Sequence, residues 1–312
     1  MEYTTTDLAH IPVLAEEVLE YLQPQPGHVV LDCTVGNGGH AVKILEKMKP
    51  GGFLIGIDKD EEILPVARQT LSKTTGNFKL YHADYAEVEN VLNLTGVEKV
   101  NGVLLDLGAS SLQFDQAERG FSFAKEGPLD MRMDRSAPGT ARDMIQRLSE
   151  RELEEVLKKY GEERWSKRIA RAIQREEKQA GITSTRQLAS VIERVVPRGR
   201  SKIHPATRVF QALRIVVNRE LDSLEIFLEK IHNYMRTGAR IVIISFHSLE
   251  DRMVKQKFRE RANLQIFKIL TKKPVTPGEA ERENNVRCRS AKLRAAERIE
   301  YGYIENVVNV YH

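Results

Sequence analysis

The sequence predicts an α/β fold that is built on a parallel sheet and interrupted by a helical insertion. In roughly the first hundred residues, short apolar runs alternate with segments of helical period, which is typical of βαβ units. After Ser111 the alternation gives way to charged segments of helical period, and strand character returns at GARIVIISF, residues 238–246. We therefore predict one α/β domain from residues 1–113 and 210–312, with a helical domain inserted at 114–209.

Four apolar runs in the first part are predicted to be parallel strands. They are HVVLDCTV at 28–35, GFLIGID at 52–58, FKLYHAD at 78–84 and VNGVLLDLG at 100–108. Helices are expected between them at 41–48, 63–71 and 86–94. The pattern is clearest in the first helix, where Ala41, Ile44, Leu45 and Met48 occupy positions i, i+3, i+4 and i+7 of one face.

The second part of the chain is predicted to be mainly helical before it returns to the sheet. Residues 142–174 and 185–195 have helical period, and 209–235 is predicted to form one long amphipathic helix. SAKLRAAERIE, at 290–300, is expected to be the last strand. The polar stretch 271–285, which contains two prolines, is predicted to be a loop.

Composition places the chain among ordinary globular proteins. It has 312 residues, 41% of them hydrophobic and 29% charged, with a formal net charge of +4. The N-terminus has no basic segment followed by an apolar run, and no stretch approaches the roughly 18 apolar residues of a membrane span. We expect a cytoplasmic protein that has no membrane segment.

The sequence offers no pattern of metal ligands. Cys33 and Cys288 lie far apart and neither belongs to a C-x-x-C pair, so neither a zinc site nor a disulfide framework is expected. His82, His204 and His247 do not have the spacing of metal ligands. We therefore expect no metal.

The glycine-rich segment VVLDCTVGNGGHA, at 29–41, predicts a site for a nucleoside. Gly36, Gly38 and Ala41 match the G-x-G-x-x-G/A spacing of a dinucleotide loop, and Gly39 is an additional glycine. The predicted strands carry acidic residues at the edge where α/β proteins bind ligands: Asp32, Asp58, Asp84 and Asp106. Asp58 follows Gly36 by 22 residues, the spacing of a carboxylate that holds ribose hydroxyls, and Asp84 could receive an adenine amino group. A tight turn and helix caps are the structural alternatives.

The acidic residues favour S-adenosylmethionine over NAD. A pyrophosphate placed at the helix N-terminus would be repelled by Asp32 and Asp106. The sulfonium and ammonium groups of S-adenosylmethionine would be attracted by the same two carboxylates.

A basic tract suggests a polymer partner. Seven Lys or Arg residues and no acidic residue occur between positions 194 and 219: Arg194, Arg198, Arg200, Lys202, Arg208, Arg214 and Arg219. Lys255, Lys257, Arg259 and Arg261 follow further along the chain. A solvated face is the simpler explanation, but next to a nucleoside site the tract favours contacts to nucleic-acid phosphates.

Seven stretches of the chain, in order, resemble one known family. They are DCTVGNGGH at 32–40, LLDLGASS at 104–111, ERGFSFAKEGPLDMRMD at 118–134, YGEERWSKRIARAI at 160–173, HPATRVFQALRIVVNRE at 204–220, ISFHSLEDRMVK at 244–255 and RSAKLRAAER at 289–298. The chain thereby resembles the RsmH (MraW) cytidine-N4 methyltransferases of bacterial small-subunit ribosomal RNA.

The resemblance implies a Rossmann-like class I methyltransferase with a helical insertion that recognises substrate. It implies methylation of N4 of a cytidine in the decoding centre of 16S rRNA, with S-adenosylmethionine as methyl donor. The implied cofactor-binding residues are Gly38, Gly39, His40, Asp58, Tyr85, Asp106 and Gln113. Gln113 follows Leu112, where a proline is common in the family, so the turn differs there. His40 beside a helix cap and Tyr85 in the core are the alternatives.

Catalysis requires a group that accepts a hydrogen bond from the cytosine amine, because its lone pair is delocalised into the ring. Asp106 and His247 are the candidate catalytic residues, since both follow strands at the ligand edge. Capping the next helix is the alternative role for His247, and for Asn218 the two alternatives are reading a base edge and simple exposure.

Two other functions remain open from the sequence. An NAD-dependent oxidoreductase is supported by G-x-G-x-x-A and opposed by Asp32. A non-catalytic RNA-binding protein with a vestigial cofactor fold is supported by the basic tract. The sequence also leaves open a homodimer, and whether the substrate is naked rRNA or the assembled small subunit.

Overall fold

The computed structural model describes residues 12–74, 76–197 and 204–300. The chain divides into two compact units. The first comprises Met1–Leu107 and Leu224–His312, and the second comprises Gly108–Ser223. Each unit is described by itself below.

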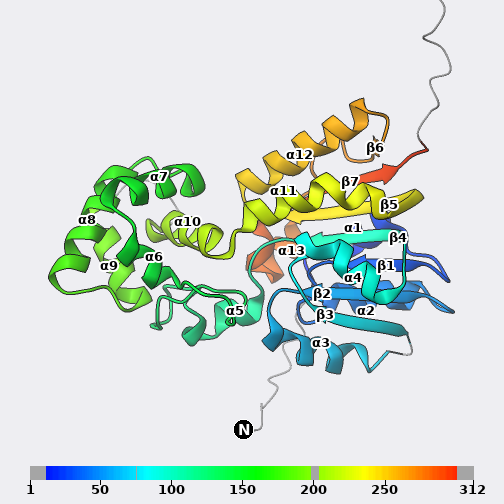
Figure 1. Cartoon of the computed structure of the whole chain (residues 1–312), viewed down its shortest axis with the longest axis horizontal. Helices are drawn as coiled ribbons and strands as arrows, with labels where there is room; N and C mark the ends of the chain where they lie inside the picture. Colours follow the sequence, from blue (N-terminus) through cyan, green and yellow to red (C-terminus); the bar gives the residue numbers. More distant parts are fainter. Residues whose placement is uncertain (1–11, 75, 198–203, 301–312) are drawn as a thin grey trace, which may run out of the picture. The chain divides into compact units, whose positions relative to one another are not determined.

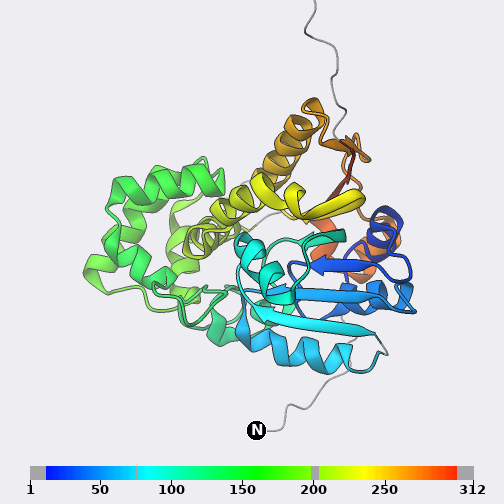
Figure 2. The same cartoon turned by 45° about the vertical axis from the view of Figure 1, so that its right-hand side comes forward.

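The first unit is built on a seven-stranded sheet (Figure 1). Its strands are β1 (Val29–Asp32), β2 (Phe53–Asp58), β3 (Asn77–His82), β4 (Val100–Asp106), β5 (Met235–Ser245), β6 (Phe267–Ile269) and β7 (Lys292–Arg298). They are arranged in the order β3-β2-β1-β4-β5-β7-β6. The first five are parallel, whereas β7 is antiparallel to both β5 and β6. Neighbouring strands lie side by side in both views (Figure 2).

Helices cover both faces of this sheet because successive strand residues point to opposite sides. Val30 and Leu54 belong to one buried cluster, while their neighbours Leu31 and Ile55 belong to another. The helices are α1 (Ala15–Leu22), α2 (Gly39–Lys47), α3 (Leu64–Leu71), α4 (Val88–Thr95), α11 (Glu220–Lys230), α12 (Ser248–Asn263) and α13 (Glu279–Asn284). Helices α1, α2 and α3 pack on the first cluster, and α4, α11 and α12 pack on the second. Near-continuous apolar strands are expected of a parallel sheet buried on both faces.

The second unit is helical and has a core of its own. Its helices are α5 (Ser111–Asp115), α6 (Ala141–Arg147), α7 (Glu150–Gly161), α8 (Ser166–Gln179), α9 (Thr185–Val195) and α10 (Ala206–Asn218). Leu153, Ile173, Ile192 and Leu213 lie in one buried cluster. Capping boxes begin α5, α6, α7 and α9, each with a Ser or Thr at the N-cap.

Five short 3-10 helices complete the described elements. They are η1 (Glu61–Ile63), η2 (Tyr85–Glu87), η3 (Ala117–Arg119), η4 (Ile231–Tyr234) and η5 (Val286–Ser290). Among the described residues, no helix is both long and apolar enough to cross a membrane.

The predicted α/β fold with a helical insertion is confirmed, and four details differ. The long helix expected at 209–235 is wrong, because Arg219 adopts a left-handed φ of 53° and separates α10 from α11. The compact helical unit runs from Gly108 to Ser223, whereas 114–209 was predicted, because α10 packs in its core. The expected loop 271–285 contains α13, and β6 was missed because three residues give too short a pattern.

Candidate functional site

The glycine loop between β1 and α2 has the backbone conformation that its glycines predict. Gly36 and Gly38 have positive φ values of 50° and 87°, which residues other than glycine rarely adopt. A side-chain carbon added at Gly36 would approach only the Thr34 carbonyl oxygen, at 3.9 Å. The loop therefore leaves free space beside Gly36, while the amide of Gly38 is bonded to the Val35 carbonyl at 2.8 Å.

Asp58, at the end of β2, is joined directly to this loop. Its Oδ2 accepts the Gly36 N–H at 2.8 Å, and its Oδ1 accepts the Asp60 N–H at 2.9 Å. Burial raises the pKa of Asp58 to about 6, and the two backbone hydrogen bonds oppose the rise. The 22-residue spacing thus corresponds to contact between the acid and the loop, and ribose binding by Asp58 stays a prediction.

Four buried polar atoms near the ends of β1 and β4 have no hydrogen-bond partner within the described residues. They are Oδ2 of Asp32, Oδ1 of Asn37, Nε2 of His40 and Oδ1 of Asp106. His40 Nε2 lies 3.6 Å from Oδ2 of Asp106. The backbone N–H of Asp106 donates to Oγ1 of Thr34 at 2.7 Å, which holds β4 against the glycine loop. Because buried polar atoms are nearly always paired, such a cluster indicates a ligand site.

The charge of this cluster is negative and poorly solvated. Burial raises the pKa of Asp32 to about 7, and His40 opposes the rise. Asp106 and Asp58 raise the pKa further by repulsion between carboxylates. A cation placed here would favour the ionised form of Asp32, whereas a pyrophosphate would be repelled.

Tyr85, which follows β3, packs against the buried cluster that contains Leu31 and Ile55. The Tyr85 ring packs edge-on against Phe227, with centroids 5.7 Å apart. Asp84 caps η2 by accepting the Ala86 N–H at 2.8 Å, and Lys59 pairs with its other oxygen at 2.7 Å. This geometry favours the capping role of Asp84, and its contact with adenine stays a prediction.

His247 begins α12 and has a structural role. Its Nδ1 accepts the Glu250 N–H at 3.4 Å, and its Nε2 lies 3.1 Å from Oε1 of Glu250. Both side chains are buried, so the ring is held by the helix that it caps. The helix-cap alternative therefore describes the observed contacts, and a catalytic role for His247 stays a prediction.

Gln113 lies in the helical unit, where it takes part in the capping box of α5. Its Oε1 accepts the Ser110 N–H at 2.9 Å, and Ser110 Oγ accepts the Gln113 N–H at 3.3 Å. The side chain is 3% exposed. Its predicted contact with the cofactor remains a prediction.

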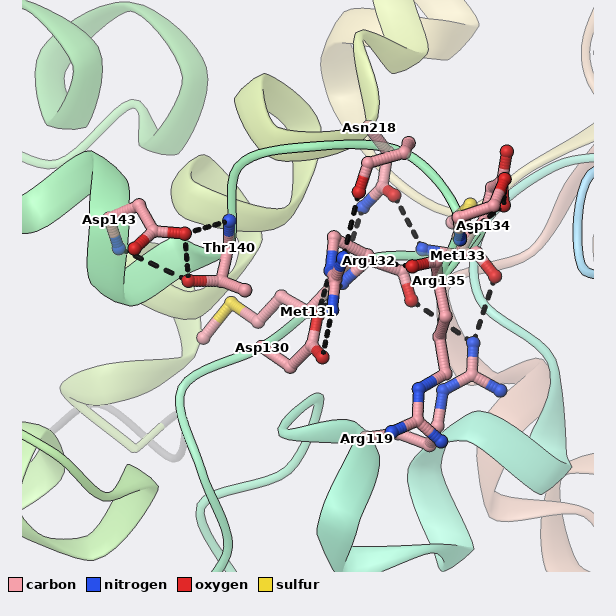
Figure 3. A network of polar contacts seen from close by, with 12 residues as sticks. Arg119, Asp130, Met131, Arg132, Met133, Asp134, Arg135, Thr140, Asp143 and Asn218 are labelled. Carbon is pink, nitrogen blue, oxygen red and sulfur yellow. Dashed lines mark hydrogen bonds and ion pairs between the residues drawn. The ribbon is translucent and has the colours of Figure 1, made fainter.

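Asn218 fixes a loop of the helical unit (Figure 3). Its Nδ2 donates to the carbonyl of Met131 at 2.7 Å, and its Oδ1 accepts the Met133 N–H at 2.7 Å. Arg119, which is 1% exposed, donates to the carbonyls of Arg132 and Met133. Asn218 is therefore not exposed, so that alternative is wrong, and its reading of a base edge stays a prediction.

This loop contains backbone strain that the network supports. Met131 is fully buried and has a φ of 62°, a conformation that is costly for a residue with a Cβ. The ion pair of Asp130 with Arg132, with Nε and Oδ1 2.7 Å apart, lies directly beside it. No sequence pattern indicates a role for Arg119, because the carbonyl groups to which it donates are brought together only in the folded loop.

The described cations of the basic tract are engaged within the protein. Arg194 pairs with Glu176, Arg214 with Glu220 and Arg219 with Asp222, and Arg208 donates to the Glu162 carbonyl. Lys257 and Arg261 both pair with Glu229. Arg198, Arg200 and Lys202 lie outside the described residues. The largely buried pair of Arg214 with Glu220 disfavours a phosphate contact there, whereas the exposed pairs of Arg194 and Arg219 are weak, and phosphate contacts at these two positions stay a prediction.

The sheet order, the glycine loop joined to Asp58 and the acidic cluster define a class of protein. They are those of a class I S-adenosylmethionine-dependent methyltransferase. The unpaired atoms of Asp32, His40 and Asp106 fit a cofactor that has cationic groups and no phosphate.

The chain belongs to the MraW methylase family, whose family model matches residues 7–299. A relative from Caldicellulosiruptor saccharolyticus, a ribosomal RNA small subunit methyltransferase H, is 45% identical over 93% of this chain and 99% of its own length. A relative of the same name from Geobacter sulfurreducens is 48% identical over 93% and 99%. The family resemblance predicted from the sequence is confirmed.

Proposed function

We propose that this protein methylates N4 of a cytidine in the decoding centre of 16S rRNA, with S-adenosylmethionine as methyl donor. Family membership supports rRNA of the small subunit as the substrate. The single observation that carries the cofactor assignment is the cluster of unpaired atoms around His40 and Asp106. This cluster fits S-adenosylmethionine better than it fits NAD, because the acidic residues would repel the phosphates of NAD.

The acidic residues make different contributions to the binding of S-adenosylmethionine. Asp58 receives the ribose hydroxyls, because each of its oxygens keeps a lone pair beyond the one backbone bond it accepts. Asp32 lies too deep for contact and acts through its charge, which attracts the cationic end of the cofactor. When bound, S-adenosylmethionine supplies an electrophilic methyl group on a sulfonium.

Asp106 is the residue that we assign to the amine. Its side chain is 25% exposed and its Oδ1 has no partner among the described residues, so it can accept a hydrogen bond from the exocyclic N–H. This bond directs the nitrogen lone pair at the methyl group. The methylated amine is a cation whose proton is lost readily, so a strong base is not required. His40 Nε2 lies 3.6 Å from the other oxygen of Asp106, close enough to stabilise its charge but not to form a hydrogen bond.

We propose that the helical unit recognises the rRNA and that the protein works in the cytoplasm. The target base has to leave its stack to reach a methyl donor. Within this unit, Asn218 and Arg119 fix the backbone of one loop by hydrogen bonds.

The test is methyl transfer to purified small ribosomal subunits and to naked 16S rRNA, with isotopically labelled cofactor. Nucleoside mass mapping is expected to find N4-methylcytidine at one position. Asp106→Asn should reduce the rate of transfer at least tenfold while the protein still binds S-adenosylhomocysteine. Binding of the cofactor without label in RNA, for the wild-type protein, would instead favour the vestigial RNA-binding protein.

A further inference from the structure

The outward face of α8 is a stripe of positive charge. Five exposed residues form it, which we call the α8 stripe: Lys167, Arg168, Arg171, Arg175 and Lys178. At 3.6 residues per turn they fall within an arc of about 100°, directly opposite the buried residues Ile169 and Ile173. The helix has 14 residues, so the stripe is roughly 20 Å long.

The stripe is not neutralised by the carboxylates of its own helix. Glu176 pairs with Arg194 at 2.8 Å, and Glu177 accepts hydrogen bonds from Gln146 and from the Ile182 backbone. Both acids therefore face neighbouring segments of the helical unit. In the sequence these acids hide the stripe, because they interrupt the run of cations between residues 167 and 178.

Four of the five cations make no ion pair within the part of the chain that the structure describes. The exception is Arg171, which lies 3.3 Å from Glu150, and both of these side chains are exposed. Helix α8 packs between α7 and α9 on its opposite side (Figure 1). A protein surface normally mixes charges of both signs, so a helix face of one sign indicates an anionic partner.

We infer that the α8 stripe binds the phosphate backbone of the RNA substrate. This inference rests on the proposed function, and it adds a phosphate-binding surface that the 194–219 tract does not include. Regularly spaced cations on a rigid helix can follow successive phosphates, which position an RNA without reading its sequence. Such contacts release counterions and make the affinity depend on salt.

The experiment compares two variants that lose the same charge. In the stripe variant, Lys167, Arg168, Arg175 and Lys178 are replaced by Gln, which is a good helix former. In the control variant, four exposed cations of the first unit, Arg68, Lys73, Lys79 and Lys99, are replaced by Gln. Filter binding measures the affinity of each protein for 16S rRNA and for small subunits from low to high salt, and circular dichroism and calorimetry with S-adenosylhomocysteine check folding.

We expect the stripe variant to bind RNA at least tenfold more weakly than the control at low salt. The slope of log affinity against log salt is negative, and it should become shallower by about 3, since each lost phosphate contact reduces its magnitude by roughly 0.7–0.9. Equal affinities and equal slopes for the two variants would overturn the inference. So would wild-type binding to vesicles of anionic lipid that the stripe variant loses while its RNA affinity is unchanged.

The failure of the proposed function would give a different result. In that case the wild-type protein transfers no methyl group to rRNA, whatever its affinity. If the wild type transfers methyl groups and the stripe variant binds and reacts like the control, only the role of the α8 stripe is wrong. If the fourfold variant folds poorly, two double variants are measured instead, one at Lys167 and Arg168 and the other at Arg175 and Lys178. Each is expected to make a smaller change in the slope of log affinity against log salt.

Discussion

The acidic residues of the cofactor site differ in what they touch. Asp58 accepts a hydrogen bond from the glycine loop, Asp106 lies near His40, and Asp32 is fully buried. From the sequence all three look alike, as acids at strand ends. Their depth and partners give each a different expected effect on ligand binding.

Asp58→Ala should weaken binding of S-adenosylhomocysteine by about 1–3 kcal/mol, the scale of hydrogen bonds to a charged group. The variant also frees the Gly36 N–H that Asp58 accepts, so part of the loss comes from the loop. Isothermal titration calorimetry measures the change, and Asp58→Asn, which keeps an acceptor, should lose less. An unchanged affinity for Asp58→Ala would remove this residue from the ribose.

Asp32 should make the stability of the ligand-free protein depend on pH in an unusual direction. With a pKa of about 7, against 3.8 in the unfolded chain, native Asp32 binds the proton more tightly. Its contribution to stability therefore falls as the pH rises from about 4 to 7. Asp32→Asn should stabilise the protein by roughly 1–3 kcal/mol at pH 8 and by much less at pH 5, measured by urea unfolding. Equal effects at the two pH values would contradict this.

Asp32→Asn should also weaken the binding of S-adenosylmethionine. S-adenosylmethionine has a sulfonium that S-adenosylhomocysteine lacks, so Asp32→Asn should reduce the affinity for the first more than for the second. For the wild type, affinity for S-adenosylmethionine should rise as the pH rises through about 6 to 7, where Asp58 and Asp32 ionise. Calorimetry at pH 5.5 and 8 measures both effects, and a flat pH profile would count against a charge-based role.

At the scale of elements, the positions at which helices end determine where side chains such as that of Asn218 lie. The left-handed Arg219 ends α10 just after Asn218, whose side chain reaches the 131–133 loop. The hydrophobic periodicity predicts the apolar face of this segment correctly. It does not predict the break at Arg219, because a single left-handed residue does not change the pattern of apolar positions. The strands were easier to predict, because apolar runs followed by acids are local.

Asn218→Asp should test the loop held by Asn218. Aspartate keeps the size and can accept the Met133 N–H, but it places an oxygen against the carbonyls of Met131 and Arg214. We expect a loss of stability of roughly 1–3 kcal/mol and a lower rate of methyl transfer, with unchanged affinity for S-adenosylhomocysteine. Urea unfolding, calorimetry and the transfer assay measure these. A normal rate under conditions where the variant is folded would limit Asn218 to a structural role.

At the scale of the whole molecule, two units with separate cores divide the chain. The buried residues of the helical unit form one cluster, and those of the sheet unit form two others. Because neither unit's buried cluster includes residues of the other, damage to one core should first affect the function of its own unit.

Leu157→Ala, in the core of the helical unit, should lower the stability of that unit by about 2–5 kcal/mol. Hydrogen exchange should speed up in peptides from residues 108–223, while affinity for S-adenosylhomocysteine stays close to that of the wild type. The matched change Leu105→Ala, in β4, should instead weaken cofactor binding. Equal loss of cofactor binding in both variants would show that the two units unfold together.

The sequence by itself determined the α/β class, the glycine loop, the acids at the strand ends and the family. These depend on short-range patterns, namely strand runs, glycines that need positive φ and a spacing of 22 residues. Only the tertiary structure decided which charges remain available. It buries Asp32, and it pairs Glu176 with Arg194 and Glu177 with Gln146, so that the acids of α8 are engaged away from its cations. Pairing and burial depend on residues far apart in the chain, and no local pattern specifies them.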